Sequence, residues 1–307
     1  MLHFDNQVAV VTGAGRGIGA AHAALLAARG AKVVVNDIGA AMDGMGGDTT
    51  LATRQVEQIR QAGGTAEADT SDISIPEGAA ALVDRAISTF GRLDIVVNNA
   101  GIYWTDGFPD IKLVELNRQL ALHVGGSFNV TRAAWPHLRE AGHGRVVMTT
   151  STGALGSATL TSYSTAKAAV LGLGRSLAVA GAPHGIKVNM VAPMGMTRMM
   201  SAGRTDVPDA PERDPSLAAP LVAILCHRDC PVNGETYISG MRRVTRLFLA
   251  ETPGYVHDGL DLAPEHLLAN WDAINDPRTP EVRTDTMSWA AANERHLHLS
   301  NTDGSAR

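Results

Sequence analysis

The sequence has little cysteine and no long apolar run, and each shortage excludes a class of protein. Its two cysteines, Cys226 and Cys230, cannot make a disulfide framework or, with no other cysteine nearby, a zinc site. No apolar run approaches the roughly 18 residues that a membrane-spanning helix needs. The first residues, MLHFDNQ, lack the charged and apolar regions of a secretory signal. We therefore expect a cytoplasmic protein without membrane insertion and without a metal site.

Basic residues are also in the minority, at 26 against 31 acidic residues, for a net charge of −5. Such a chain has no excess positive charge for a phosphate backbone, so nucleic acid is not an expected partner. Hydrophobic residues make up 45% of the chain, which is enough for a globular core. The 32 glycines favour an α/β architecture with tight turns between strands and helices.

Short apolar runs rich in β-branched residues alternate with longer segments of helical period. This alternation predicts an α/β protein, a single-domain Rossmann-type doubly wound parallel sheet over residues 1–240, with a C-terminal helical extension over 241–307. The predicted strands are 8–12, 32–37, 65–69, 95–98, 145–149, 187–191 and 235–238, and the predicted helices are 18–29, 50–62, 76–90, 112–139 and 162–180.

The first predicted strand is followed at once by a glycine-rich turn, TGAGRGIG, and then by a helical pattern. Glycines there let the backbone approach a pyrophosphate at a helix N-terminus. Asp37 ends the second strand, where its carboxylate can accept hydrogen bonds from both adenosine ribose hydroxyls and repel a 2′-phosphate. NAD is the expected cofactor, although Arg16 leaves NADP open. The predicted cofactor-binding residues in this half of the chain are Gly13, Gly15, Arg16, Gly17, Ile18, Gly19, Asp37, Asp72, Ile73, Asn99, Ala100 and Gly101.

Tyr163 and Lys167 stand four residues apart in a predicted helix, and Ser151 precedes them after the fifth strand. On one helix face the ammonium of Lys167 can lie near the phenol of Tyr163 and lower the phenol's pKa from about 10 towards neutrality. A tyrosine tuned in this way is a general acid and base for a hydroxyl or a carbonyl. The pattern predicts an enzyme rather than a binding module.

These motifs and their order resemble the short-chain dehydrogenase/reductase family over residues 1–240. The segments VVVNDIG, LHVGGSFNVTRAAW and APLVAILCHRDC are similar, more narrowly, to the (3R)-hydroxyacyl-CoA dehydrogenase part of peroxisomal multifunctional enzyme type 2 and its bacterial relatives. The resemblance implies that Tyr163 exchanges the substrate proton, that Lys167 also holds the nicotinamide ribose, and that Ser151 hydrogen-bonds the substrate oxygen. It also implies a homodimer or homotetramer.

Three positions depart from the family pattern. His123 stands where the family usually has an asparagine of a water relay. Ser151 lies 12 residues before Tyr163, one fewer than is common, which makes the adjacent Thr150 an alternative. After the sixth strand, the usual Pro-Gly that contacts the nicotinamide carboxamide is Pro193-Met194-Gly195 here.

The sequence leaves the substrate open. The resemblance implies a 3-hydroxyacyl-CoA or a steroid-like secondary alcohol. The alternatives are a small sugar or polyol, and a non-catalytic dinucleotide sensor on the same fold. A methionine-rich stretch could adapt to a bulky apolar ligand, and nearby arginines could meet coenzyme A phosphates. These residues are Met190, Met194, Met196, Met199, Met200, Arg198, Arg204 and Arg213.

The last segment, residues 241–307, lies beyond the minimal family domain. Its amphipathic stretch around Val244 and Phe248, its aromatic residues Trp271 and Trp289, and a helix start at Pro264 predict ordered structure. We expect this extension to pack on the same domain, complete the substrate cleft and take part in a subunit contact. Cys226 and Cys230 are expected on one apolar helix, with His227 beside them at the surface.

Overall fold

The chain divides into two units, Met1–Arg246 and Leu247–Arg307. The structure is a computed structural model, and it describes residues 1–41, 43–195 and 210–293. Within these ranges no helix is both long enough and apolar enough to span a bilayer. Each unit is described below by itself.

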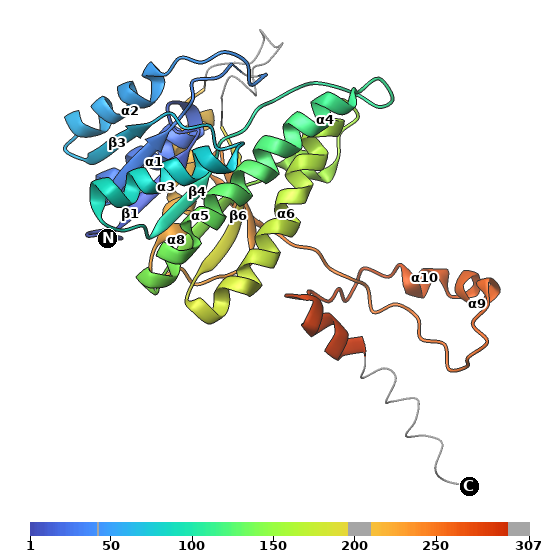
Figure 1. Cartoon of the computed structure of the whole chain (residues 1–307). Coiled ribbons are helices and arrows are strands. Elements are labelled where there is room, and N and C mark those ends of the chain that lie inside the picture. The colour runs from blue at the N-terminus through green and yellow to red at the C-terminus, as the bar shows by residue number, and fades with distance from the viewer. Residues whose placement is uncertain (42, 196–209, 294–307) are drawn as a thin grey trace. The chain divides into compact units, whose positions relative to one another are not determined.

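The described residues of the first unit form one eight-stranded sheet in the order β3-β2-β1-β4-β5-β6-β7-β8 (Figure 1). All neighbouring pairs from β3 to β7 are parallel. The chain leaves β1 towards β2 on one side and returns to β4 on the other, which is the switch point where open α/β sheets bind ligands. The strands are β1 (Val8–Thr12), β2 (Lys32–Asn36), β3 (Thr65–Asp69), β4 (Ile95–Asn98), β5 (Arg145–Thr149), β6 (Lys187–Met194), β7 (Thr236–Gly240) and β8 (Arg243–Leu247).

Helices cover both faces of this sheet, over two separate apolar cores. Alternate strand residues point to opposite faces. Val11 and Val33 pack with α1, α2 and α8, whereas Val10 and Val34 pack with α3, α5 and α6. Burial on both faces explains why the strands are almost unbroken apolar runs. The helices are α1 (Gly17–Ala28), α2 (Thr50–Gln61), α3 (Pro76–Phe90), α4 (Leu113–Leu120), α5 (Ser127–Ala141), α6 (Thr161–Gly181) and α8 (Ala219–Cys226).

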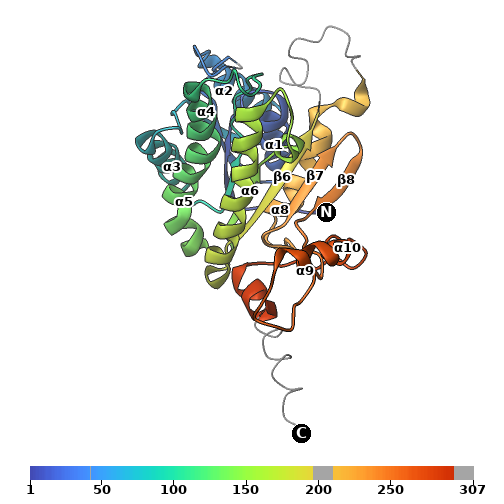
Figure 2. The same ribbon diagram turned by 90° about the vertical axis from the view of Figure 1, so that its right-hand side faces the viewer.

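The predicted doubly wound sheet is confirmed, and the predicted strands are present with small shifts at their ends. Two elements of secondary structure differ from the sequence prediction. The helix expected over 112–139 is α4 and α5 joined by a π-helical turn, Ala121–Gly126. Strand β8 was not predicted. Met241 and Arg242 have φ of 50° and 62°, the backbone of a two-residue hairpin turn, and Figure 2 shows β8 beside β7.

The segment after α8 is more buried than its sequence indicates. Helix α8 ends at Cys226, so Cys230 is not on the helix as expected, and both thiols are free and buried. His227, expected at the surface, is buried, with its ring edge against Phe4 at 5.4 Å between centroids. Arg145 explains the difference, because its Nε donates to the His227 carbonyl at 2.9 Å and draws the segment onto the sheet.

The second unit contains the short helices α9 (Pro264–Ala269) and α10 (Trp271–Ile274), and Pro264 opens α9 as predicted. Polar contacts hold it together: Glu251 pairs with Arg283 at 2.6 Å and accepts from Trp289 Nε1 at 2.9 Å. Among the described residues 247–293, Ala292 is the only buried one. This unit therefore has almost no core of its own.

Candidate active site

The glycine-rich turn after β1 and the segment after β4 form one interlocked structure. Asn99 Nδ2 donates to the carbonyls of Thr12 and Gly13, each at 3.0 Å, and Thr12 Oγ1 accepts the backbone N–H groups of Asn99 and Ala100, also at 3.0 Å. A Cβ on Gly13 would lie 2.7 Å from the Cα of Ala100, and one on Gly19 would lie 2.3 Å from the Gly13 carbonyl. Only glycine fits at these two positions.

The N-terminus of α1 is open towards the same region. Arg16, at the N-cap, makes no capping hydrogen bond and instead donates from Nη2 to the Ala40 carbonyl at 2.6 Å. The first N–H groups of a helix without such a cap can bind an anion. Asp37 accepts from the N–H groups of Gly15 at 2.9 Å and Gly39 at 2.7 Å. Each of its two carboxylate oxygens can accept a further hydrogen bond.

Tyr163 and Lys167 lie on the first turns of α6, next to the end of β5. Lys167 Nζ donates to the Thr149 carbonyl at 2.9 Å and lies 5.7 Å from the centre of the Tyr163 ring. Ser151 accepts the N–H of the residue two positions on, at 3.0 Å, and lines the same cavity as Tyr163. Thr150 is buried, and its hydroxyl donates to the Lys167 carbonyl at 2.7 Å. Because that hydroxyl is occupied, Ser151 is the better candidate of the two.

Burial dominates the electrostatics of this pair. It raises the pKa of the Tyr163 phenol, while the hydrogen bond with Ser151 acts in the opposite direction. Burial also lowers the pKa of the Lys167 ammonium to about 7. The direction for Tyr163 is opposite to the one that the Tyr/Lys spacing predicts. The physical reason is that both groups lose water on burial, which disfavours the charged form of each. The ammonium also donates its hydrogen bond to the Thr149 carbonyl rather than to the phenol.

His123 lies in the π-helical turn, buried beside Tyr163. Its Nε2 hydrogen-bonds the Ile102 carbonyl at 2.9 Å, so this nitrogen carries the hydrogen. Burial and the nearby Lys167 ammonium lower the pKa of His123 well below its ordinary value, which keeps the ring neutral. The ring packs directly over Gly101, where a Cβ would lie 2.5 Å from its Cε1. In place of the expected asparagine, the chain has an imidazole that anchors the segment after β4.

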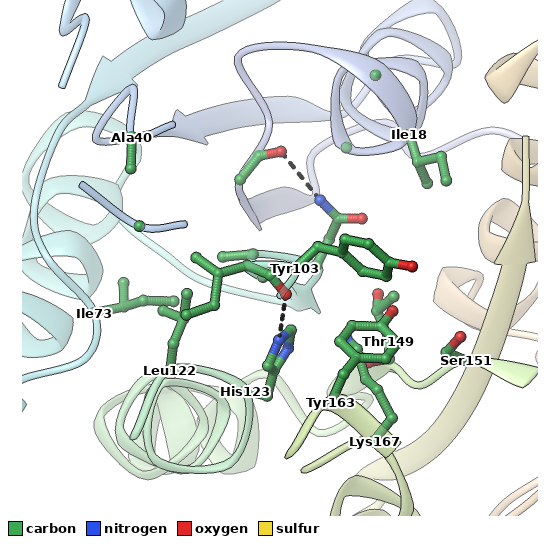
Figure 3. Close-up of a pocket in the computed structure, with 18 of the residues that line it drawn as sticks. Ile18, Ala40, Ile73, Tyr103, Leu122, His123, Thr149, Ser151, Tyr163 and Lys167 are labelled. Carbon is green, nitrogen blue, oxygen red and sulfur yellow. Dashed lines mark hydrogen bonds between the residues drawn. The ribbon is translucent and has the colours of Figure 1, made fainter. Parts of the chain in front are cut away.

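One cavity of about 1040 Å³ connects these groups (Figure 3). Gly15 is the exception among the predicted residues. It is not part of the wall, because its N–H faces Asp37. The wall contains the other predicted residues, Gly13, Arg16, Gly17, Ile18, Gly19, Asp37, Asp72, Ile73, Asn99, Ala100, Gly101, Ser151, Tyr163, Lys167, Pro193 and Gly195.

Few of the methionines and arginines proposed for substrate binding line the cavity, as far as the described residues show. Met194 lines the cavity, whereas Met190 is buried in the core. Arg213 ends a short 3₁₀ turn and is not part of the cavity wall. The remaining residues of that cluster, at 196 and 198–204, lie outside the described residues.

Sequence reasoning did not single out Tyr103, which lines the cavity, or Thr12 and Asp106, which hold its loops. Thr12 joins the two loops, and its place directly before Gly13 was an available clue. Tyr103 lines the cavity with its ring 5.3 Å from that of Tyr163. Asp106 binds the start of α6, where Ser162 Oγ donates to its carboxylate at 2.7 Å. No sequence pattern pointed to the last two, because their partners are distant in the chain.

Comparison with known proteins places the chain in a family. The model of the short chain dehydrogenase family matches residues 7–207, and the chain belongs to this family. A short-chain type dehydrogenase/reductase of Mycobacterium tuberculosis is 39% identical over 278 residues, covering 89% of this chain and 95% of the relative.

Two solved structures are similar over most of the chain. Full-length peroxisomal multifunctional enzyme type 2 of Drosophila melanogaster has a TM-score of 0.79 and 30% identity, covering 98% of this chain and 50% of that one. The chain thus spans about half of that enzyme's length. A 7α-hydroxysteroid dehydrogenase, complexed with NADH and 7-oxo glycochenodeoxycholic acid, has a TM-score of 0.67 and 30% identity, covering 78% of this chain and 94% of that one.

Proposed function

We propose that this chain is an NAD-dependent oxidoreductase that interconverts a secondary alcohol and a ketone, with a 3-hydroxyacyl-CoA or a steroid-like compound as substrate. The observation that carries the proposal is that Ser151, Tyr163 and Lys167 lie in one cavity with the glycine-rich turn. A dinucleotide sensor would need the turn but has no use for a buried tyrosine and lysine pair beside it.

The residues present fit a dinucleotide. The open N-terminus of α1 suits a pyrophosphate, and the glycines of the turn, Gly13, Gly17 and Gly19, line the cavity beside it. Asp37 would hold the adenosine ribose, and its charge would oppose a 2′-phosphate. Arg16 donates to the Ala40 carbonyl, which supports NAD over NADP. When bound, this cofactor accepts or supplies a hydride.

The chain's own residues handle the proton and the substrate oxygen. Because burial raises the pKa of Tyr163, its phenol is protonated at neutral pH and can donate to a ketone oxygen. Ser151 lines the same cavity as Tyr163, and its hydroxyl can hydrogen-bond the same oxygen. In the oxidative direction the phenolate must form, and the Lys167 ammonium 5.7 Å from the ring stabilises that charge. Asn99, Ala100 and Gly101 would line the nicotinamide half.

The substrate class is supported by resemblance and by relatives. The fly relative is a peroxisomal multifunctional enzyme, and the bile-acid complex is a hydroxysteroid dehydrogenase. A small sugar or polyol is the second candidate for the same site. We further propose that the protein forms a homodimer or homotetramer, that residues 241–307 belong to its assembly, and that it works in the cytoplasm, where its two free thiols stay reduced.

The test is NAD reduction, followed at 340 nm, across 3-hydroxyacyl-CoAs, hydroxysteroids and polyols, with NADP measured in parallel. We expect turnover of one of the first two classes, with NAD preferred. Tyr163→Phe should lower kcat on the order of 10²- to 10⁴-fold, because it removes the proton-transfer group, while NAD still binds. Thr165→Ala, at an exposed position two residues further along α6, is the matched control for changes to this helix.

Near-wild-type turnover by Tyr163→Phe would overturn the catalytic assignment and favour the sensor. Better use of NADP by the wild-type protein would overturn the cofactor assignment. Turnover of polyols alone would support the second candidate.

A further inference from the structure

A second tyrosine stands next to the reacting one. Tyr103 and Tyr163 have ring centroids 5.3 Å apart at an interplanar angle of 70°, and Figure 3 shows both at the cavity. The His123 ring contacts another side of Tyr163, at 5.6 Å and 85°. Aromatic pairs at this distance are in edge-to-face contact, so a substrate does not pass between the rings. Tyr103 therefore bounds the space in which a substrate meets Tyr163.

The segment that carries Tyr103 is anchored on both sides. Before it, the Ile102 carbonyl is held by His123 Nε2 at 2.9 Å. After it, Asp106 is attached to the start of α6: its carboxylate accepts from Ser162 Oγ at 2.7 Å, and its carbonyl accepts the Thr161 N–H at 3.2 Å. Only residues 103–105 lie between these anchors. The chain on either side of Tyr103 is thus fixed by the π-helical turn before it and, after it, by α6, the helix that carries Tyr163.

Tyr103 does not have the surroundings of a proton-transfer group. The buried ammonium of Lys167 and the hydroxyl of Ser151 both interact with Tyr163. What Tyr103 offers is a half-buried aromatic ring of fixed position at the cavity wall. Such a ring acts through its shape, by restricting how a substrate approaches the reacting oxygen.

Resting on the proposed function, we propose that Tyr103 is a substrate-positioning residue that selects the substrate class. Its ring narrows the cavity beside Tyr163. This favours a slender unbranched chain next to the reacting carbon, as in a 3-hydroxyacyl thioester, over a fused-ring alcohol. The aromatic ring of Tyr103 selects the substrate, and its hydroxyl takes no part in this selection.

The test compares Tyr103→Phe, Tyr103→Leu and Tyr103→Ala with two probes, 3-hydroxybutyryl-CoA and a 7-hydroxysteroid. With the acyl-CoA, kcat/KM should fall on the order of tenfold in the leucine and alanine variants, about the effect of one aromatic contact. Tyr103→Phe should stay within about threefold of wild type. The ratio of kcat/KM for the steroid to that for the acyl-CoA should rise in the two smaller variants. The Kd for NAD should not change.

Trp104→Leu is the matched control, because Trp104 is in the same loop, is 39% exposed and is not part of the cavity wall. Should the alanine variant fail to fold, the leucine variant gives the same comparison. An unchanged steroid to acyl-CoA ratio, or equal effects of Tyr103→Leu and Trp104→Leu, would overturn the inference while leaving the proposed function intact. Wild-type turnover of neither probe would overturn the proposed substrate and this inference together.

Discussion

His22 is a residue whose burial has a direct energetic consequence. It lies on α1, 1% exposed, and both ring nitrogens lack a hydrogen-bond partner among the described residues. Burial lowers its pKa from 6.5 to about 4. The folded protein therefore binds this proton less readily than the unfolded chain does. The stability that the neutral ring contributes is fully present above pH 6.5 and is lost as the pH falls through 4.

We expect His22→Leu to change the acid sensitivity of folding. The wild-type protein should lose about 2 kcal/mol of unfolding free energy between pH 7 and pH 5 through this residue, and the leucine variant should not lose this part. Urea unfolding at both pH values measures it. His184→Leu, at an exposed histidine, should follow the wild type. An equal loss in wild type and His22→Leu would show that His22 is not the cause.

At the scale of single residues, the sequence predicted those that belong to contiguous motifs. Tyr163, Lys167 and the glycines of the turn are recognised because their function depends on near neighbours. Tyr103 and Asp106 were not predicted, since Asp106 meets Ser162 across 56 positions of the chain. His123 was noticed as an unusual residue, but its bond to the Ile102 carbonyl could be found only in the structure.

At the scale of elements, α6 begins without a capping side chain of its own. Its N-cap residue is Leu160, which has no polar group, and Asp106 supplies the acceptor from another loop, with its Oδ1 3.3 Å from the Ser162 N–H. A carboxylate at a helix N-terminus also interacts favourably with the helix dipole. The helix that carries Tyr163 is therefore fixed by the loop after β4.

Asp106→Ala should lower the free energy of unfolding by about 1 kcal/mol, the usual effect of removing a helix cap, and should lower kcat because Tyr163 is on the first turn of α6. Thermal unfolding and steady-state kinetics measure the two effects. Asp110→Ala, at an exposed position of the same loop, is the control. If both variants behave alike, the carboxylate of Asp106 does not position α6.

Element bounds were predictable wherever one periodic pattern ran to a clear stop, as in β1, α3 and β5. The π-helical turn between α4 and α5 was not, because the apolar spacing continues through it. Strand β8 also escaped prediction. Its turn uses Met241 and Arg242 at positive φ, where glycine or asparagine is the usual sign of a hairpin.

At the scale of the whole molecule, the second unit has almost no core of its own, so its stability must come from other contacts. Several large apolar side chains of this unit are strongly exposed, including Leu249 at 67%, Leu268 at 74% and Met287 at 77%. Where exposed apolar side chains form a contiguous patch on a protein, the patch marks an interaction surface. We expect this unit to gain its core through the assembled protein.

Truncation after Arg246 removes the second unit and keeps all of β8 except its last residue, Leu247. We expect the truncated protein to elute at a different oligomeric size in sizing chromatography and to lose turnover of long substrates first. A milder variant, Leu268→Ser, should weaken assembly in the same direction without removing the chain. A truncated protein that keeps its assembly and its full rate on a long-chain hydroxyacyl-CoA would contradict the expectation.

The strand order of the sheet bears on how the chain can fold while it is being synthesised. The first strand made, β1, is central, and on each side of it every later strand joins the outer edge of those already present. No strand has to insert between two others, so a growing chain can extend the sheet as each segment emerges.

Until β8 is made, an apolar edge stays open to other chains. β8 closes this edge with Arg243 and Arg246, and charged edge strands resist aggregation.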